Sequence, residues 1–178
     1  MGYAGGTTPS PTYRRIGDHS ETLQLVFDPT VIGYEKLLEH FWQSHDPTRA
    51  AFSRQYRAAV FYHNPEHRRL AEISRERLTE RLKRAVRTRI EPAGEFHPAE
   101  DYHQKYILRR YGRFMKAFEQ MYPDPVDLAA STAAARVNGY LGGYGSHQDL
   151  MRDVGRLGLT EPLKALLIDI FDQRRDDR

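Results

Sequence analysis

Three strand-like runs alternate with three helix-like runs between residues 22 and 122, and this order limits the fold more than any other feature of the chain. Residues 22–27 (TLQLVF) have one thoroughly apolar face, residues 56–63 contain the β-prone stretch AAVFY, and residues 86–91 end at Pro92. A segment with helical spacing follows each run. These patterns predict one domain in which helices pack against β-strands.

Each helical segment carries its apolar residues on one face. The first of them shows the spacing i, i+3, i+4, i+7 and i+8 in Tyr34, Leu37, Leu38, Phe41 and Trp42. Asn64 and Pro65 supply an N-cap and a proline at the first helical position, which predicts a helix to about residue 85. A third helix is expected from about residue 98 until the prolines at 123 and 125 break it.

The remainder of the chain predicts less regular structure. Residues 2–17 are rich in Gly, Thr, Ser and Pro and predict a long loop, and the small residues of 126–145 predict a coil on the domain surface. Ser146 and Asp149 resemble a capping box. They precede a last helix whose apolar stripe is Leu163, Leu166, Leu167, Ile170 and Phe171. We expect residues 1–125 to form the main domain and residues 126–178 to form a coil and helical extension packing on it. The alternative is that the apolar stripe of the last helix binds a partner and does not pack on its own domain.

Composition excludes several classes of protein. The chain has no cysteine among its 178 residues, so these residues provide no disulfide, no thiolate metal site and no cysteine nucleophile. No apolar run approaches the ~20 residues of a membrane span, and the opening residues lack the apolar centre of a signal peptide. We therefore expect a cytoplasmic protein with no membrane partner.

Histidines and arginines invite two further interpretations. His63 and His67 are separated by Pro65 at a strand–helix boundary and do not share a helical face, while Glu100 and His103 lack the further carboxylates of a helical metal site. The arginines of residues 68–84 could follow a phosphate backbone, yet glutamates are interleaved with them, as on a solvated helix face. We expect neither a metal nor a nucleic-acid partner.

Several segments of the first 106 residues resemble the A-type peptide methionine sulfoxide reductases. The stretches GYAGGTTPSPTY, DHSE, FDP, FWQSHDP and QYR occur in this order, and EPAGEFHPAEDYHQKY continues the match. They are similar to the family's GY-x-GG, GHAE, YDP, FW-x-x-HDP, QYRS and EDYHQ segments. Any one of them would be weak evidence, but several in register are specific. The resemblance implies an α+β fold, a two-layer sandwich in which helices cover a mixed sheet. This chain would lack the first strand–helix unit of the family's ferredoxin-like core and would carry a C-terminal helical appendage.

The resemblance also implies a chemistry and its residues. In the family a thiolate attacks the sulfoxide sulfur and becomes a sulfenic acid, which a second thiol reduces. Glu21 matches the family's acid, held neutral in an enclosed pocket, and Tyr13 and Tyr56 match the hydroxyls that bind the sulfoxide oxygen. Without the family, Glu21 could be an exposed loop carboxylate and the tyrosines ordinary residues at the edge of the core.

Three departures from the family pattern stand out. The family's nucleophile lies in a GCFW box upstream of GYAGG, whereas this chain begins Met1-Gly2-Tyr3. The family's GND segment is shortened to RAAFSR, so the aspartate that would support Tyr56 has no counterpart. Leu141 stands in GYLGG where many members have a resolving cysteine. External thiols would then have to regenerate the enzyme.

Two explanations of the missing nucleophile stay open. The family commonly has valine just before GYAGG, and a bacterial GTG start codon is written as methionine, so Met1 would be a misplaced start. Alternatively, the nucleophile is selenocysteine, whose codon is taken for a stop. In both cases we expect the gene product to reduce methionine-S-sulfoxide, free or in peptides, in a thiol-dependent reaction. We expect no bound cofactor, and thioredoxin or a similar protein as the reductant. The alternative is a non-catalytic module that binds methionine sulfoxide or a protein partner.

Overall fold

The structure is a computed structural model that describes residues 1–176. It divides the chain into two compact units, Met1–Glu100 and Asp101–Arg178. The boundary expected after residue 125 falls just inside α5 (Pro125–Ala130), which contacts α4 (Gly112–Met121). The two compact units meet at residues 100 and 101, and the domain division expected after residue 125 stays a prediction.

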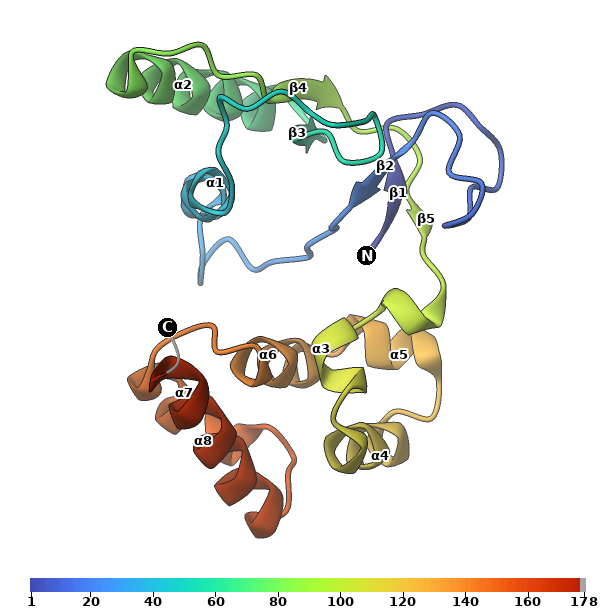
Figure 1. The fold of residues 1–178 in the computed structure, drawn as a ribbon, viewed down its shortest axis with the longest axis vertical. Coiled ribbons are helices and arrows are strands. Elements are labelled where there is room, and N and C mark those ends of the chain that lie inside the picture. Colours follow the sequence, from blue (N-terminus) through green and yellow to red (C-terminus); the bar gives the residue numbers. More distant parts are fainter. Residues whose placement is uncertain (177–178) are drawn as a thin grey trace. The chain divides into compact units, whose positions relative to one another are not determined.

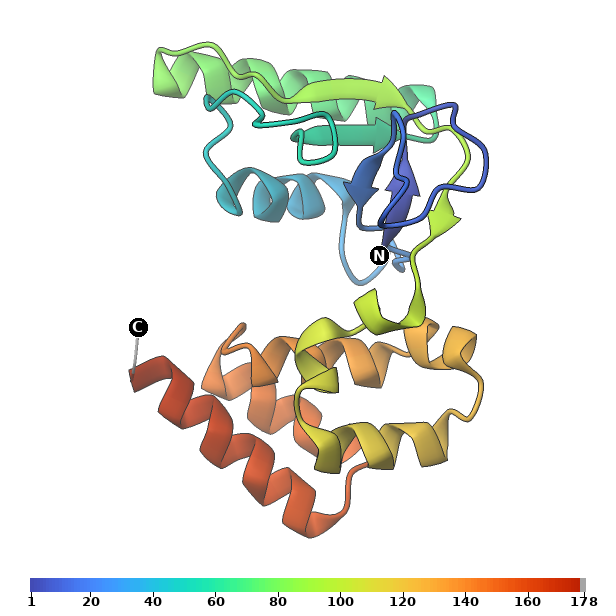
Figure 2. The ribbon, with the colours of Figure 1, turned by 45° about the vertical axis from the view of Figure 1, so that its right-hand side comes forward.

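The first unit combines two small sheets with two helices (Figures 1 and 2). Its three-stranded antiparallel sheet has the order β2-β1-β5, from β1 (Gly2–Ala4), β2 (Ser20–Thr22) and β5 (His97–Pro98). Its second sheet is a parallel pair, β3 (Ala59–Tyr62) and β4 (Arg89–Pro92). Helices α1 (Tyr34–Gln43) and α2 (Pro65–Leu82) pack on each other, and α2 also packs on the parallel pair. The expected α+β class is confirmed.

The helices of this unit begin where the sequence predicts. The Asn64 side chain accepts a hydrogen bond from the His67 amide at 2.8 Å, as an N-cap does, and α2 ends where Lys83 adopts a left-handed φ of 51°. The apolar face of α1 turns inward, and Trp42 donates its indole N–H to the Ser74 hydroxyl of α2 at 3.0 Å. The core between the elements is small and consists of Leu38, Trp42, Val60, Ala71 and Leu78.

The strands are shorter than predicted, and the strand expected over residues 22–27 is largely wrong. β2 ends at Thr22, and the following side chains are exposed, with 61% of Leu23 and 99% of Val26 accessible. An alternating pattern becomes a strand only where another strand offers backbone partners, and β1 pairs with residues 20–22 alone. Conversely, β1 forms inside the segment that predicts a long loop.

The second unit is entirely helical among its described residues. The single helix expected after residue 98 is wrong: it is broken into η1 (Asp101–His103), α3 (Tyr106–Arg109) and α4, with Lys105 at a left-handed φ of 51° between the first two. The coil expected over residues 126–145 is also largely wrong, because it contains most of α5 and all of α6 (Thr132–Leu141). Alanine is the strongest helix former, and the side chains of Asp124 and Ser131 cap the two helices.

The last helices of the second unit close its core. The capping box of Ser146 and Asp149 is confirmed at the start of α7 (His147–Asp153), which η2 (Val154–Arg156) and α8 (Glu161–Asp176) follow. The apolar stripe of α8 buries its central residues against α6 and α7. The largest fully buried side chains of this unit are Phe114, Phe118 and Phe171, and buried leucines that include Leu141 and Leu167 surround them. Among the described residues, no helix has the length and apolar character that crossing a membrane requires.

Asp153 is a buried carboxylate that ties α6 to α7. It accepts the Tyr140 hydroxyl at 2.6 Å and lies 2.6 Å from the Arg136 guanidinium, while only 5% of the residue is exposed. Burial alone would raise the pKa of Asp153, but the Tyr140 hydrogen bond and the arginine charges outweigh it and hold this pKa below its usual value. The carboxylate is therefore expected to stabilise the helical unit in its ionised form.

Asp153→Ala should lower the free energy of unfolding of the helical unit by about 3 kcal/mol, because Tyr140 loses its partner in the core and Arg136 loses its counter-charge. Denaturant unfolding followed by circular dichroism measures the loss, and the exposed Asp169→Ala is the control, expected within about 0.5 kcal/mol of the parent. The pKa of Asp153 is lower in the folded chain than in the unfolded chain, where it is about 4. Its contribution to the free energy of unfolding is therefore present above pH ~4 and is lost as the pH falls below that value. A loss that does not shrink in acid would contradict this account.

Candidate functional site

Glu21 lies on β2, directly opposite Tyr3 of β1. Its amide donates to the carbonyl oxygen of Gln55 at 3.0 Å, and the hydroxyl of Ser20 donates to the carbonyl oxygen of Arg54 at 2.9 Å. These two bonds fasten β2 to the segment that leads into β3. Glu21 is thus part of a regular strand and not of a free loop.

The Gln55 side chain connects Glu21 to Tyr56. Its amide nitrogen donates to Glu21 Oε1 at 2.7 Å and to the Tyr56 hydroxyl oxygen at 3.1 Å. The pKa of Tyr56 is raised, and partial loss of hydration is the largest cause. The charge of Glu21, the neighbouring Tyr13 hydroxyl and the hydrogen bonds of Tyr56 with these two residues raise it further. The structure therefore brings the three predicted site residues, Tyr13, Glu21 and Tyr56, into one cluster.

Tyr13 stands at the tip of a tight turn in which Thr12 and Arg15 exchange backbone hydrogen bonds of 3.3 and 3.0 Å. Glu100 holds this turn from the other end of the unit's sequence. One carboxylate oxygen of Glu100 accepts the Tyr13 amide at 3.0 Å, and the other accepts the Tyr3 hydroxyl at 2.7 Å. Glu100 thus ties the backbone of Tyr13 to the Tyr3 side chain of β1.

Asp18 shapes the loop that carries Tyr13. Its carboxylate accepts the backbone amides of Thr7 and Thr8 at 2.8 and 2.9 Å and also their hydroxyls, and these bonds hold the pKa of Asp18 far below its usual range. The buried His19 ring accepts the Gly6 amide through Nδ1 at 3.3 Å and bonds the Thr8 carbonyl through Nε2 at 2.9 Å. The Gly- and Thr-rich segment is therefore an ordered loop.

Arg57 fixes the segment behind Tyr56. Its guanidinium makes a two-pronged ion pair with Glu91 at 2.8 and 2.9 Å and donates to the Ser20 hydroxyl at 2.8 Å, while 7% of its side chain is exposed. Burial would raise the pKa of Glu91, but the hydrogen bonds and charge of Arg57 outweigh burial and lower it. The side chain also lies over the Phe61 ring, 5.8 Å from its centroid. Arg57 therefore joins β2, β3 and β4.

The tyrosine–glutamate cluster faces solvent. The exposed fractions are 44% for Tyr13 and 54% for Tyr56, and Glu21 is partly exposed. An enclosed pocket, which the family resemblance implies for the acid, is not formed by the described residues. The polar groups converge, but among the described residues Tyr13 and Tyr56 stay open to water.

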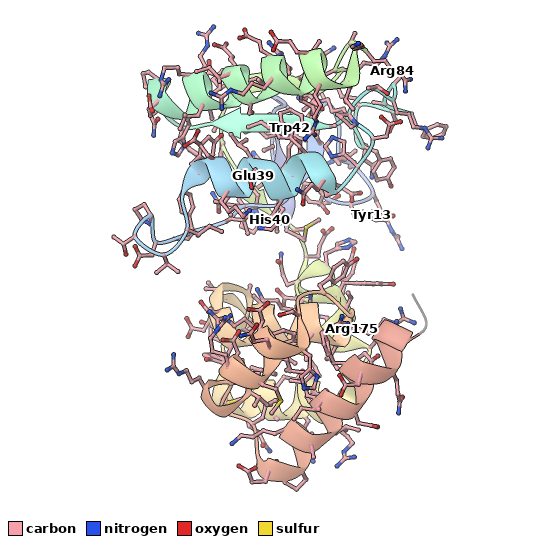
Figure 3. All side chains as sticks on the ribbon, turned by 90° about the vertical axis from the view of Figure 1, so that its left-hand side faces the viewer. Tyr13, Glu39, His40, Trp42, Arg84 and Arg175 are labelled. Carbon is pink, nitrogen blue, oxygen red and sulfur yellow. The ribbon has the colours of Figure 1, made fainter. Side chains whose placement is uncertain are left out.

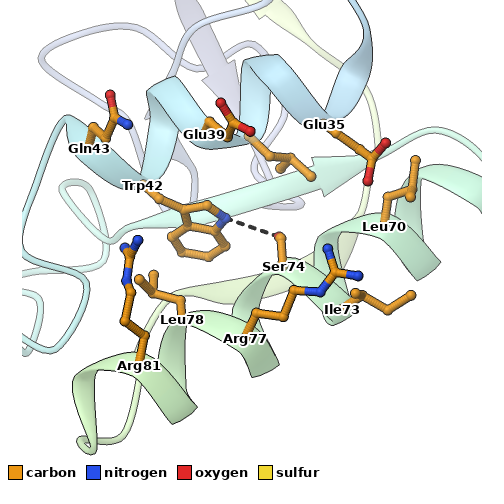
Figure 4. Close-up of a pocket in the computed structure, with 11 residues that line it drawn as sticks. Glu35, Glu39, Trp42, Gln43, Leu70, Ile73, Ser74, Arg77, Leu78 and Arg81 are labelled. Atoms are coloured by element: carbon orange, nitrogen blue, oxygen red, sulfur yellow. Dashed lines mark hydrogen bonds between the residues drawn. The ribbon is translucent and has the colours of Figure 1, made fainter.

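A separate hollow of about 250 Å³ lies between α1 and α2 (Figure 4). Figure 3 labels Glu39 and Trp42, two of the α1 residues that line it. Trp42 and four aliphatic side chains form its floor, Glu35 and Glu39 lie on its α1 wall, and Arg77 and Arg81 lie on its α2 wall. None of the three predicted site residues lines it. The walls carry charges of opposite sign, as exposed faces of neighbouring helices commonly do.

No group of three or more potential metal ligands gathers in the described part of the chain. Both carboxylate oxygens of Glu100 serve the Tyr3 hydroxyl and the Tyr13 amide, which gives this residue a structural role. The arginines early in α2 pair with glutamates one turn away, namely Arg68 with Glu72 and Arg69 with Glu66, as the solvated-face interpretation expects.

Three residues of the site do not emerge from sequence reasoning: Gln55, Arg57 and Glu100. Gln55 and Arg57 flank Tyr56 in the QYR motif, and Glu100 opens the EDYHQ motif. The motifs contain them, yet their roles depend on contacts with Glu21, Glu91 and Tyr13, which are distant in the sequence.

Comparison with known proteins agrees with the motifs. The model of a protein family described as "Peptide methionine sulfoxide reductase" matches residues 1–127. The chain belongs to this family. A relative named peptide methionine sulfoxide reductase from Drosophila melanogaster is 36% identical over 162 residues, which cover 90% of this chain and 65% of the relative. A relative named peptide methionine sulfoxide reductase MsrA from Methanothermobacter thermautotrophicus is 44% identical over 118 residues, covering 60% of this chain and 70% of the relative.

Solved structures of the family share the fold. Reduced Mxr1 from Saccharomyces cerevisiae matches with a TM-score of 0.56 and 33% identity, covering 63% of this chain and 70% of that one. Methionine sulfoxide reductase A of Corynebacterium diphtheriae matches with a TM-score of 0.50 and 33% identity, covering 62% of each chain. This chain spans 65% of the Drosophila relative and 57% of a relative from Oryza sativa, so it matches part of the length of each.

Proposed function

We propose that this chain binds methionine sulfoxide through Tyr13, Glu21 and Tyr56 and serves its thiol-dependent reduction to methionine. The observation that carries the proposal is the cluster itself, in which one carboxyl and two phenol hydroxyls from separate segments meet. A sulfoxide oxygen is a strong hydrogen-bond acceptor, and hydroxyl donors and a carboxylic acid are the groups that bind and protonate such an oxygen. Membership of the family supports the choice of the S epimer, free or in peptides.

The proposed reaction consumes two thiols and forms methionine, a disulfide and water. A thiolate attacks the sulfoxide sulfur, the oxygen passes to the attacking sulfur as a sulfenic acid, and a second thiol then displaces it as water. Glu21 gives a proton to the oxygen while charge develops on it, and Tyr13 and Tyr56 donate hydrogen bonds to the same atom. Because the 178 residues contain no cysteine, the attacking cysteine or selenocysteine must come from outside them.

No bound cofactor is needed for this chemistry, because the electrons come from thiols. Thioredoxin or a similar reductant is the proposed partner, as membership of the family suggests. The proposed place of action is the cytoplasm, where thioredoxin and glutathione keep thiols reduced.

A second candidate function is a non-catalytic module that binds methionine sulfoxide. The lack of cysteine favours it, because binding needs only the donors of the cluster and no thiolate. Both candidates share the binding step. They differ in whether a thiolate from outside the 178 residues reaches the bound sulfoxide, so a reductase assay of a chain carrying the upstream coding sequence separates them.

The binding step can be tested on the chain as it stands. The N-acetyl, N-methylamide derivative of methionine-S-sulfoxide should shift the ring resonances of Tyr13 and Tyr56 in ¹³C-tyrosine NMR, and the R epimer should bind more weakly. Tyr56→Phe should weaken binding about fivefold, the effect of one lost hydrogen bond, whereas Tyr106→Phe, a change at an exposed residue of α3, should leave it unchanged. Resonances of Tyr13 and Tyr56 that do not move at millimolar sulfoxide would rule out this site.

A further inference from the structure

We propose that Gln55 is a positioning residue of this site, whose side-chain amide orients the Glu21 carboxyl and the Tyr56 hydroxyl toward one ligand oxygen. The proposal rests on the proposed function, because that oxygen belongs to the sulfoxide. A primary amide nitrogen carries two hydrogens, and both are in use here: one meets Glu21 Oε1 at 2.7 Å and the other meets the Tyr56 oxygen at 3.1 Å.

These two bonds limit where the protons of the site can lie. Since Oε1 of Glu21 faces an N–H donor, it acts as an acceptor, and a protonated Glu21 carries its hydrogen on Oε2. The Tyr56 oxygen also accepts from Gln55, so the hydroxyl hydrogen of Tyr56 must point away from Gln55. The two groups that are to donate to the sulfoxide thus present their hydrogens away from the amide.

The backbone of Gln55 is held firmly enough for this task. Its carbonyl oxygen accepts the Glu21 amide at 3.0 Å, so Gln55 contacts Glu21 through both its main chain and its side chain. On either side, the Arg54 carbonyl accepts the Ser20 hydroxyl, and the buried Arg57 guanidinium pairs with Glu91. The side chain of Gln55 is itself partly buried, which limits its alternative rotamers.

Gln55 also supports the Tyr56 hydroxyl, for which the sequence indicates no supporting residue. The shortened RAAFSR segment lacks the aspartate that the family resemblance would place as a support of Tyr56. In this chain a donor from the adjacent residue contacts the Tyr56 hydroxyl instead. The support is local, and it connects Tyr56 directly to the acid.

Gln55→Met tests the proposal on the full chain, because methionine keeps the length of the side chain and removes both donors. We expect the affinity for the S-sulfoxide derivative to fall about tenfold, and the pKa of Tyr56 to rise above its parent value, since an N–H donor that stabilises the phenolate is lost. The ¹³C resonance of the Tyr56 ring, followed against pH without ligand, measures the second effect. Gln120→Met, at an exposed glutamine of α4, is the matched control.

The outcomes separate this proposal from the proposed function. An unchanged affinity and an unchanged Tyr56 titration in Gln55→Met overturn the role of Gln55, while sulfoxide binding by the parent still supports the site. A parent chain that binds no sulfoxide overturns the proposed function, and the role of Gln55 at a sulfoxide site with it. If Gln55→Met does not fold, Gln55→Glu replaces it: this change keeps the shape, removes the donors and should weaken binding at neutral pH at least as much.

Discussion

Glu21→Gln should lower the rate of sulfoxide reduction by ~10² to 10⁴ in a chain extended by a family segment that carries the GCFW box, the range in which a positioned general acid contributes. A thiolate that attacks sulfur drives electrons onto the sulfoxide oxygen, and this oxygen needs a proton as its bond to sulfur breaks. Glutamine keeps the shape and can donate a hydrogen bond, but it does not transfer a proton. Affinity for the sulfoxide should therefore change far less than the rate.

Single-turnover formation of the sulfenic acid, followed against pH, isolates this step from thiol recycling. Tyr13→Phe and Tyr56→Phe should each reduce the rate less than Glu21→Gln does, because either hydroxyl partly replaces the other in binding the developing charge. Glu39→Gln changes an exposed carboxylate of α1 outside the cluster and serves as the matched control. A rate for Glu21→Gln within about threefold of the parent would show that Glu21 is not the acid.

The 178-residue chain itself should show no methionine sulfoxide reductase activity with dithiothreitol. None of its residues can supply a thiolate. The side chains of the Tyr13, Glu21 and Tyr56 cluster are proton donors and not nucleophiles toward sulfur. The free methionine formed from methionine-S-sulfoxide is measured by chromatography over hours. The extended chain is the positive control, because it differs only by the segment that carries the thiol.

Dithiothreitol without protein sets the background of this assay. Turnover by the 178-residue chain above that background, removed by Glu21→Gln, would mean that the site activates an external thiol directly. The general-acid role of Glu21 would then survive, but the requirement for a thiolate on a segment of the protein would not. Absence of turnover in the extended chain as well would favour the non-catalytic binding module.

Local sequence patterns determined the helices of the first unit and the identity of the family. The face of α1 and the Asn64-Pro65 start of α2 follow from short-range geometry, since capping and helical periodicity act within one or two turns. The ordered motifs from GYAGG to EDYHQ pointed to Tyr13, Glu21 and Tyr56, and the structure brings these residues together. Their chemical roles remain proposals.

The tertiary structure alone decided which apolar runs became strands, how the chain divides and what supports the site. Residues 23–27 alternate like a strand but have no partner strand, whereas Gly2–Ala4 carries no such pattern and pairs on both sides. The alanine-rich segment before Leu141 is helical because its caps and a shared core stabilise it. Gln55 contacts Glu21 across 34 positions of sequence, and Tyr13 contacts Glu100 across 87 positions. Such contacts follow from chain topology, which no local pattern encodes.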